Sequence, residues 1–183
     1  MYADYVDNWL KSQEKEKPDP ENTFLMKWMK VVIHCGTLGG TYILERKLRK
    51  SYYHPFIYSR HGYFNVSSDE AQKVVNTVLE NEATTLRDGE EICFVISSGE
   101  GLSRPNGMVF TSERVMWYLS SKVIAHKQGT IAIGELDTPK VKKGLSDTCS
   151  VSFGDVKCGS VSDFRSDQLL LAFLRQIKLA ANP

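Results

Sequence analysis

The chain has 183 residues, and its 23 Lys and Arg against 22 Asp and Glu give a formal net charge of +1. This balance excludes a whole-chain field that draws the protein toward nucleic acid or anionic lipid. Hydrophobic residues make up 42% of the chain, which excludes global disorder and indicates a folded core.

The sequence predicts neither a secretory signal nor a transmembrane helix. The N-terminus lacks a basic start followed by an apolar run. The most apolar window, residues 24–44, is interrupted by Lys27, Lys30 and His34. A Lys side chain at the bilayer centre costs about 3 kcal/mol on insertion scales. We therefore expect a cytoplasmic protein.

Residues 1–87 have the periodicity of helices. A first apolar stripe consists of Tyr2, Tyr5, Val6, Trp9 and Leu10. A charged stretch with Pro18 and Pro20 ends that helix, and further helices are predicted from residue 22 or 23 and over residues 41–52.

A stronger helix signal begins at Ser67, which with Glu70 forms a capping box. The residues behind it form one apolar stripe, ended by a turn near Gly89: Ala71, Val74, Val75, Val78 and Leu79.

The periodicity changes to two from Glu90 onward. Residues 92–96 predict a strand buried on both faces. Residues 107–119 then predict a hairpin with Ser112 and Glu113 as its turn, pairing Phe110 with Val115. That register gathers Met108, Phe110, Val115, Trp117 and Leu119 on one face and leaves Thr111, Arg114 and Tyr118 on the other.

A second hairpin is predicted around Gly154 and Asp155. Its inner face holds Cys149, Val151, Phe153, Val156 and Cys158, while Ser150, Ser152 and Lys157 point outward. The stretches GTIAIGEL and KVKKG add strands between the two hairpins. Ser166 then caps a final helix whose apolar face holds Leu169, Leu170, Phe173, Leu174 and Ile177.

The four cysteines show no CxxC pairing, so we expect buried free thiols in a reducing compartment. His34, Cys35, His54 and His61 match no zinc spacing. The glycine-rich stretches lack the GK[ST] of a phosphate-binding loop, and no nucleophile elbow is present. We predict no catalytic residue, no metal and no cofactor.

The segment 46–63 is the best candidate for a binding site. Cations interleaved with aromatic rings suit single-stranded nucleic acid or an anionic membrane surface. The candidate residues are Arg46, Lys47, Arg49, Lys50, Tyr53, Tyr58 and Arg60. The competing interpretation is that the rings pack onto the rest of the protein while the cations stay solvated.

Residues 88–180 resemble the pleckstrin-homology-like (PH-like) superfamily, particularly the small bacterial PH-like domains. The similar features are DGEEICFVISSG as first strand, the hairpin GMVFTSERVMWYL, the strand pair TIAIGELDTPKVKKG, and CSVSFGDVKCGSV before a closing helix. The resemblance implies a partly open antiparallel barrel closed by a C-terminal helix, used for binding or assembly. Phosphoinositide-binding relatives carry several cations in the first hairpin loop, where this chain has Arg104 alone, so specific phosphoinositide binding is not expected.

We therefore expect an α+β protein with a helical N-terminal region at 1–87 and a PH-like domain at 88–183. Its expected function is non-catalytic protein–protein binding or self-association. The alternative is binding of an anionic surface, either a membrane or single-stranded nucleic acid, through residues 46–63.

Overall fold

The computed structural model describes residues 2–15, 57–60, 66–81, 85–97, 107–119, 127–143, 149–161 and 167–182. The chain divides into two compact units, Met1–Lys11 with Phe56–Pro183 and Ser12–Pro55. Only residues 12–15 of the second unit are described, as the end of a helix. The helices expected after residue 22 and over 41–52 lie outside the described residues.

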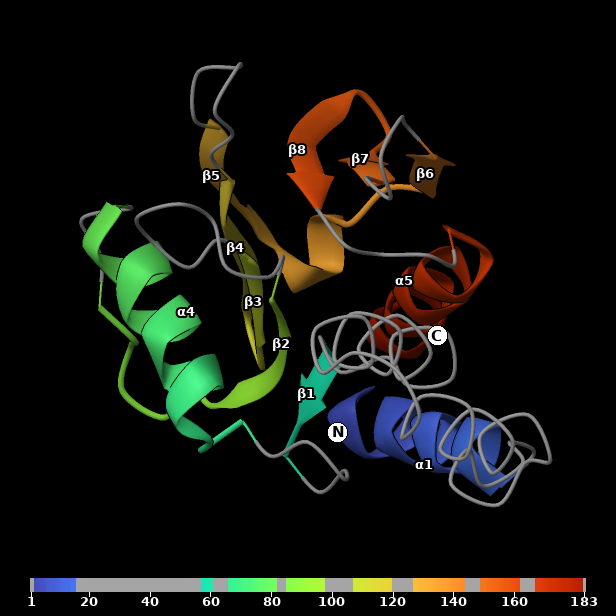
Figure 1. Cartoon of the computed structure of the whole chain (residues 1–183), viewed down its shortest axis with the longest axis horizontal. Helices are drawn as coiled ribbons and strands as arrows, with labels where there is room; N and C mark the ends of the chain where they lie inside the picture. Colours follow the sequence, from blue (N-terminus) through green and yellow to red (C-terminus); the bar gives the residue numbers. More distant parts are fainter. Residues whose placement is uncertain are drawn as a thin grey trace, which may run out of the picture. The chain divides into compact units, whose positions relative to one another are not determined.

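The first unit combines helices with two antiparallel sheets, so it is α+β (Figure 1). The larger sheet has the strand order β1 (Ile57–Ser59), β2 (Ile92–Ser97), β3 (Gly107–Thr111), β4 (Arg114–Leu119) and β5 (Lys127–Ala132). After a short 3-10 helix (Ile133–Glu135), the smaller sheet has the order β6 (Pro139–Lys143), β7 (Cys149–Phe153) and β8 (Val156–Val161). The helices are α1 (Tyr2–Lys15), α4 (Asp69–Asn81) and α5 (Asp167–Ala181).

The hairpin of β3 and β4 has the register that its sequence predicts. Phe110 pairs with Val115 and Met108 pairs with Trp117. The Thr111 hydroxyl accepts hydrogen bonds from the backbone N–H groups of Glu113 and Arg114, at 3.2 and 3.0 Å. These bonds hold a turn whose two residues are neither glycine nor asparagine, the residues that such turns favour.

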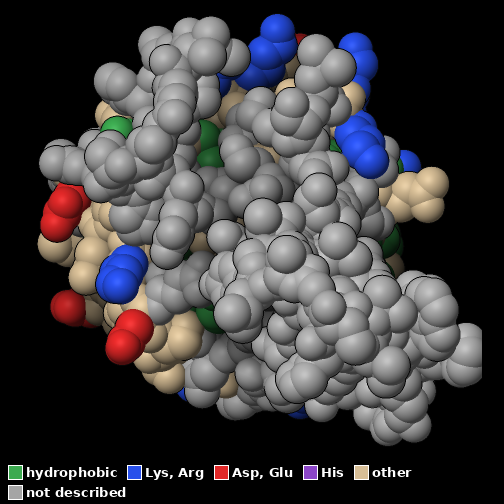
Figure 2. Space-filling model, viewed as in Figure 1, with side chains coloured by type: hydrophobic (Ala, Val, Ile, Leu, Met, Phe, Trp, Pro, Cys, Tyr) green, Lys and Arg blue, Asp and Glu red, His purple; other side chains and the backbone are tan. Residues whose placement is uncertain are grey.

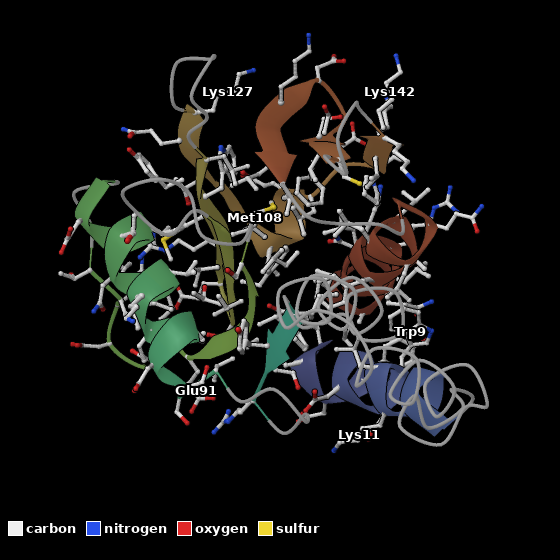
Figure 3. All side chains as sticks on the ribbon, in the orientation of Figure 1. Trp9, Lys11, Glu91, Met108, Lys127 and Lys142 are labelled. Atoms are coloured by element: carbon white, nitrogen blue, oxygen red, sulfur yellow. The ribbon has the colours of Figure 1, made fainter. Side chains whose placement is uncertain are left out.

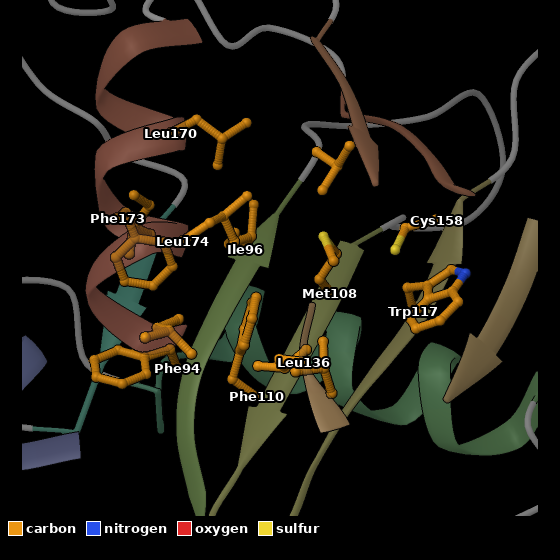
Figure 4. Packing of buried hydrophobic residues seen from close by; sticks show 14 of the residues in the cluster. Phe94, Ile96, Met108, Phe110, Trp117, Leu136, Cys158, Leu170, Phe173 and Leu174 are labelled. Carbon is orange, nitrogen blue, oxygen red and sulfur yellow. The ribbon is translucent and has the colours of Figure 1, made fainter. Parts of the chain in front are cut away.

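The two faces of the larger sheet bury different clusters. The face with Met108, Phe110 and Trp117 packs with the smaller sheet, α1 and α5 in the main core (Figure 4). The opposite face, with Val95, Val109 and Met116, packs against α4. Strands buried on both faces explain why apolar residues are continuous along β2 and β3.

Helix α4 begins one residue later than its sequence predicts. The side-chain oxygen that caps it belongs to Ser68, which accepts a hydrogen bond from the backbone N–H of Ala71 at 3.3 Å. This capping residue lies one position after Ser67, the residue that the sequence predicts as the cap. The apolar stripe is confirmed, because Ala71, Val74, Val75 and Val78 are all buried.

The hairpin of β7 and β8 turns at Gly154, as predicted. Gly154 has a φ of +56°, a conformation that favours glycine at the first turn position. Cys149, Val151, Phe153 and Cys158 are buried as predicted, but Val156 is 41% exposed, so its assignment to the core was wrong. Alternation gives the side of a sheet that a residue faces, whereas the extent of the core decides whether that side is covered.

The first turns of α1 and one face of α5 contribute to the main core. Tyr2, Ala3 and Val6 of α1 are buried, and the Tyr2 hydroxyl donates to the carbonyl oxygen of Thr111 at 2.5 Å. Tyr5 is 55% exposed, so its placement in the apolar stripe was wrong.

The apolar face predicted for α5 is confirmed. Leu170, Phe173, Leu174 and Ile177 are fully buried, and Leu169 is half-buried. Among the described helices, none has the length and apolarity that a bilayer span requires.

Gly107 lies in close contact with the backbone of β2 and with α4. A Cβ atom built at residue 107 would collide with the carbonyl oxygen of Ile96 and lie 2.5 Å from Cγ1 of Val74. We expect Gly107→Ala to destabilise the fold by about 3 kcal/mol, because the colliding Ile96 atom is backbone and cannot rotate away. Thermal unfolding followed by circular dichroism should show a melting temperature about 6–12 °C lower. Gly134→Ala is the control, since a Cβ there meets nothing within 4 Å. Equal melting temperatures for both variants would contradict the close approach at residue 107.

Candidate functional site

Two of the seven predicted site residues lie in the described part of the chain. Arg46, Lys47, Arg49, Lys50 and Tyr53 lie outside the described residues. Tyr58 and Arg60 lie in and directly after β1, a strand that the sequence did not predict.

Tyr58 is a packing residue in this structure. Its side chain is buried, and it belongs to the cluster that joins the larger sheet to α4, with Ala71 and Val95. A nucleobase can stack only on an accessible ring. The buried ring of Tyr58 is therefore not presented for stacking, and it packs as the competing interpretation of this segment predicts.

Arg60 is half-exposed and its charge is paired. Its guanidinium forms an ion pair with the carboxylate of Glu91, with a second contact from Nη2 to Oε1 at 3.4 Å. The acidic partner offsets the charge that Arg60 offers to an anion.

A network of hydrogen bonds surrounds the buried carboxylate of Glu90. Arg114 binds it through two hydrogen bonds, Nε to Oε1 at 2.9 Å and Nη2 to Oε2 at 3.0 Å. The Thr111 hydroxyl donates to Oε1 at 2.6 Å, and the backbone N–H of Arg87 donates to Oε2 at 2.9 Å. Nη2 of Arg114 also donates to the carbonyl oxygen of Thr85 at 2.8 Å. These bonds tie residues 85–90 to the turn between β3 and β4.

This arrangement is electrostatically stable rather than reactive. Burial acts to raise the pKa of Glu90, but the hydrogen bonds from Arg114, Arg87 and Thr111 outweigh it and lower that pKa to about 2. Such a carboxylate stays ionised at neutral pH and has no proton to donate. Sequence alternation assigns Thr111 and Arg114 to the face opposite the main core, and the structure shows that both side chains are buried there.

The described cysteines are free and buried, as the sequence predicts: Cys93, Cys149 and Cys158. Burial raises the pKa of the Cys93 thiol, and it raises that of Cys158 to about 12. Both thiols are therefore protonated at neutral pH and are poor nucleophiles. Across the described ranges, no group of three or more His, Cys, Asp or Glu side chains is placed to hold a metal ion.

The outward face of the smaller sheet is basic and carries hydroxyl groups. Lys140 pairs with Ser152, which also pairs with Lys157, and Lys142 pairs with Ser150. Three adjacent strands thus place Lys, Ser and Lys in one row, at a spacing of about 4.8 Å per strand. All three lysines are exposed. We call Lys140, Lys142, Lys157, Ser150 and Ser152 the lysine–serine face.

Among the described residues, the acidic side chains near this face lie toward the turn of the β7–β8 hairpin. Asp155 is in that turn, and Asp137 lies beside Gly154, with Oδ1 at 3.8 Å from Nζ of Lys178. Lys142, which is labelled in Figure 3, is the fourth residue of β6 and pairs with Ser150, away from that turn. Figure 2 shows Lys and Arg side chains at the upper right, over the region of β6 to β8. Cations and hydroxyls in this arrangement can donate hydrogen bonds to phosphate or carboxylate oxygens.

The sequence of the β7–β8 hairpin predicts that Ser150, Ser152 and Lys157 point outward, but it does not indicate that they share a face with the lysines of KVKK. The sequence feature that indicates outward lysines on β6 is the alternation of Lys140 and Lys142 with Val141. A local pattern does not reveal which strand lies beside which, so the face became visible only when β6 was paired with β7.

No protein-family model, no curated protein and no solved structure matches this chain.

Proposed function

We propose that this protein is a non-catalytic binding module with a PH-like fold, and that it acts by binding another protein chain. The observation that carries this proposal is the order of the elements. Four consecutive antiparallel strands, β2 to β5, precede a three-stranded sheet, β6 to β8, and an amphipathic helix follows. This is the order that the PH-like resemblance of residues 88–180 implies.

The position of α5 supports the closing role that the resemblance assigns to a C-terminal helix. The ring of Phe173 meets Phe94 edge-on with centroids 5.5 Å apart, and it meets Phe110 in the same way at 5.9 Å. Edge-to-face pairs of this kind are favourable beyond the apolar area that they bury. A cytoplasmic location belongs to the same proposal, because the free thiols are those of a reducing compartment.

The binding proposal is tested by cross-linking the full chain in its own cells and isolating it under denaturing conditions. We expect an adduct with a protein, either a second copy or a different chain, at a mass above 20.7 kDa. Recovery of the chain linked only to nucleic acid or lipid would contradict the proposal.

The second candidate function is binding of an anionic surface, and the lysine–serine face favours it. Binding of an anionic surface through the segment 46–63 stays a prediction for those residues of the segment that lie outside the described ranges. For Tyr58 and Arg60, burial and the ion pair with Glu91 argue against a binding role. Lys140 and Lys157, which flank Ser152 in one row, are exposed, and the nearby carboxylate of Asp137 offsets part of the charge of Lys140.

Titration of labelled single-stranded DNA, RNA and phosphatidylserine vesicles at low salt separates the two candidates. If the protein acts by binding another protein chain, no probe binds. If it binds an anionic surface through the lysine–serine face, binding falls steeply with salt. Replacing Lys140, Lys142 and Lys157 with Ala then lowers the salt slope for single strands by about 2. Lys73→Ala, an exposed lysine of α4, is the matched control and should leave that slope unchanged. If Arg49→Ala with Lys50→Ala abolishes binding while the triple variant does not, the site is the segment 46–63.

A further inference from the structure

The larger sheet ends at β5, and no strand in the described part of the chain pairs with the second edge of β5. Its ladder with β4 runs through six consecutive residue pairs, from Leu119 with Lys127 to Arg114 with Ala132, without a bulge. Lys127, Gln128, Thr130 and Ala132 are exposed. This edge is therefore regular and accessible.

The hydrogen bonding of β4 determines which backbone groups the free edge presents. The ladder continues past β5 with a bond from the N–H of Ile133 to the carbonyl oxygen of Glu113, at 2.7 Å. Because the direction of these groups alternates along a strand, Ile131 and Gly129 also bond toward β4. Gln128, Thr130 and Ala132 therefore direct their N–H and C=O groups to the free edge.

The other three sheet edges in the described ranges, those of β1, β6 and β8, carry features that block the addition of a strand. Strand β1 has three residues, and the carbonyl oxygen of its Ser59 accepts a bond from the N–H of Val66 at 3.3 Å. Strand β6 begins with Pro139 and carries lysines, and β8 has a register shift with Gly159 at a φ of +128°. Proline, lysine, bulges and short length are the usual protections of an edge strand. Strand β5 has only Lys127, at its first position.

We propose that β5 pairs antiparallel with β5 of a second copy of this chain, about a two-fold axis at Thr130. An antiparallel edge is self-complementary, because a two-fold rotation brings the same strand against itself in the opposite direction. In this register Thr130 faces its own copy, and Gln128 of each chain faces Ala132 of the other. Each of these three pairs exchanges two backbone hydrogen bonds.

The charges of the strand permit this pairing. The two copies of Lys127 lie about 20 Å apart in this register, six residues of strand rise. The net charge of the whole chain is +1, so the copies repel each other weakly. Threonine side chains opposite each other are a favourable cross-strand pair. This inference rests on the proposed assembly role and names its surface and partner.

Sedimentation equilibrium of the full chain tests the proposal. One pair of strands buries less surface area than a standard protein–protein interface, so a weak dimer is expected. The measurement therefore covers protein concentrations from about 1 μM to about 500 μM. The weight-average mass is expected to rise from 20.7 kDa toward twice that value. Thr130→Pro removes both central N–H donors and should weaken the association at least tenfold. Since the N–H of residue 130 does not bond to β4, the monomer should remain folded.

Two further variants keep the test decisive. Thr130→Lys places like charges opposite each other at the axis and should weaken association at least tenfold. Thr130→Val retains the backbone donor and should leave the dimer intact. Amide exchange of residues 128–132 should slow as the concentration of the native chain rises, and it should not slow in Thr130→Lys.

A monomer at every concentration would overturn the β5 pairing. So would a dimer that persists in both Thr130→Pro and Thr130→Lys, with unprotected amides at residues 128–132. An adduct in cells with a different protein, together with a monomeric purified chain, would overturn this inference and leave the proposed function standing. Adducts with nucleic acid or lipid alone would instead overturn the proposed function.

Discussion

Replacing Arg114 with methionine is expected to lower the free energy of unfolding by about 3–5 kcal/mol, because it leaves the buried carboxylate of Glu90 without its cation. Methionine keeps much of the length of the side chain, so the loss is mainly electrostatic. Urea denaturation followed by circular dichroism measures this change.

A surface ion pair nearby provides the control. Arg87 contacts Glu113 at 2.8 Å, but both side chains are well exposed, at 64% and 40%. We expect Arg87→Met to change the free energy of unfolding by less than about 1 kcal/mol. If the two Arg→Met variants unfold at the same urea concentration, the buried contact between Arg114 and Glu90 is not the main stabilising one.

The same network predicts a specific loss of stability in acid. The pKa of Glu90 falls from an ordinary 4.5 to about 2 on folding, so the ionised form is favoured in the native state. Its contribution, about 3 kcal/mol, is fully present above pH 4.5 and is lost as the pH falls toward 2. A Glu90→Gln variant should show a flatter dependence of stability on pH across this window. An unchanged dependence would mean that other carboxylates account for the acid sensitivity.

Truncating Phe173 to alanine is expected to cost about 3–5 kcal/mol and to loosen α5 from the main core. The ring is fully buried and contacts Phe94 and Phe110 edge-on, so its loss leaves a cavity among rings that cannot easily collapse. Thermal unfolding and near-ultraviolet circular dichroism report the loss of stability and of aromatic packing.

Two variants of α5 check the source of this effect. Phe173→Leu restores most of the apolar volume and should recover more than half of the lost stability. Leu179→Ala removes a side chain that is 59% exposed on the same helix and should change stability by less than about 0.5 kcal/mol. A Phe173→Ala variant as stable as Leu179→Ala would contradict the packing of α5 in the core.

Local patterns predicted the parts of this fold that depend on neighbouring residues. The register of Phe110 against Val115 follows from the spacing of two apolar runs about one turn, since a slip of one residue would mix the faces. The buried stripe of α4 and the buried face of α5 follow from the helical period in the same way.

Patterns were insufficient where a distant segment decides the environment of a residue. Alternation placed Thr111 and Arg114 on the face opposite the main core, where the structure has them, but it did not reveal that Glu90 and the segment beginning at Thr85 cover them and bury the ion pair of Arg114 with Glu90. Tyr58 was a candidate stacking residue because cations surround it in the sequence, and its contact with α4 makes it a core residue.

The sequence by itself determined the α+β composition, the antiparallel hairpins and the stripes that the helices bury, because periodicities of two and 3.6 residues are properties of neighbouring residues. Only the tertiary structure decided that Lys140 and Lys157 share a face and that, among the described strands, β5 lies at the edge of its sheet. Strand order depends on contacts between segments far apart in the chain, and no local spacing encodes which edge is left without a partner. The candidate binding surfaces depend on that order, so the sequence contained their residues without revealing their arrangement.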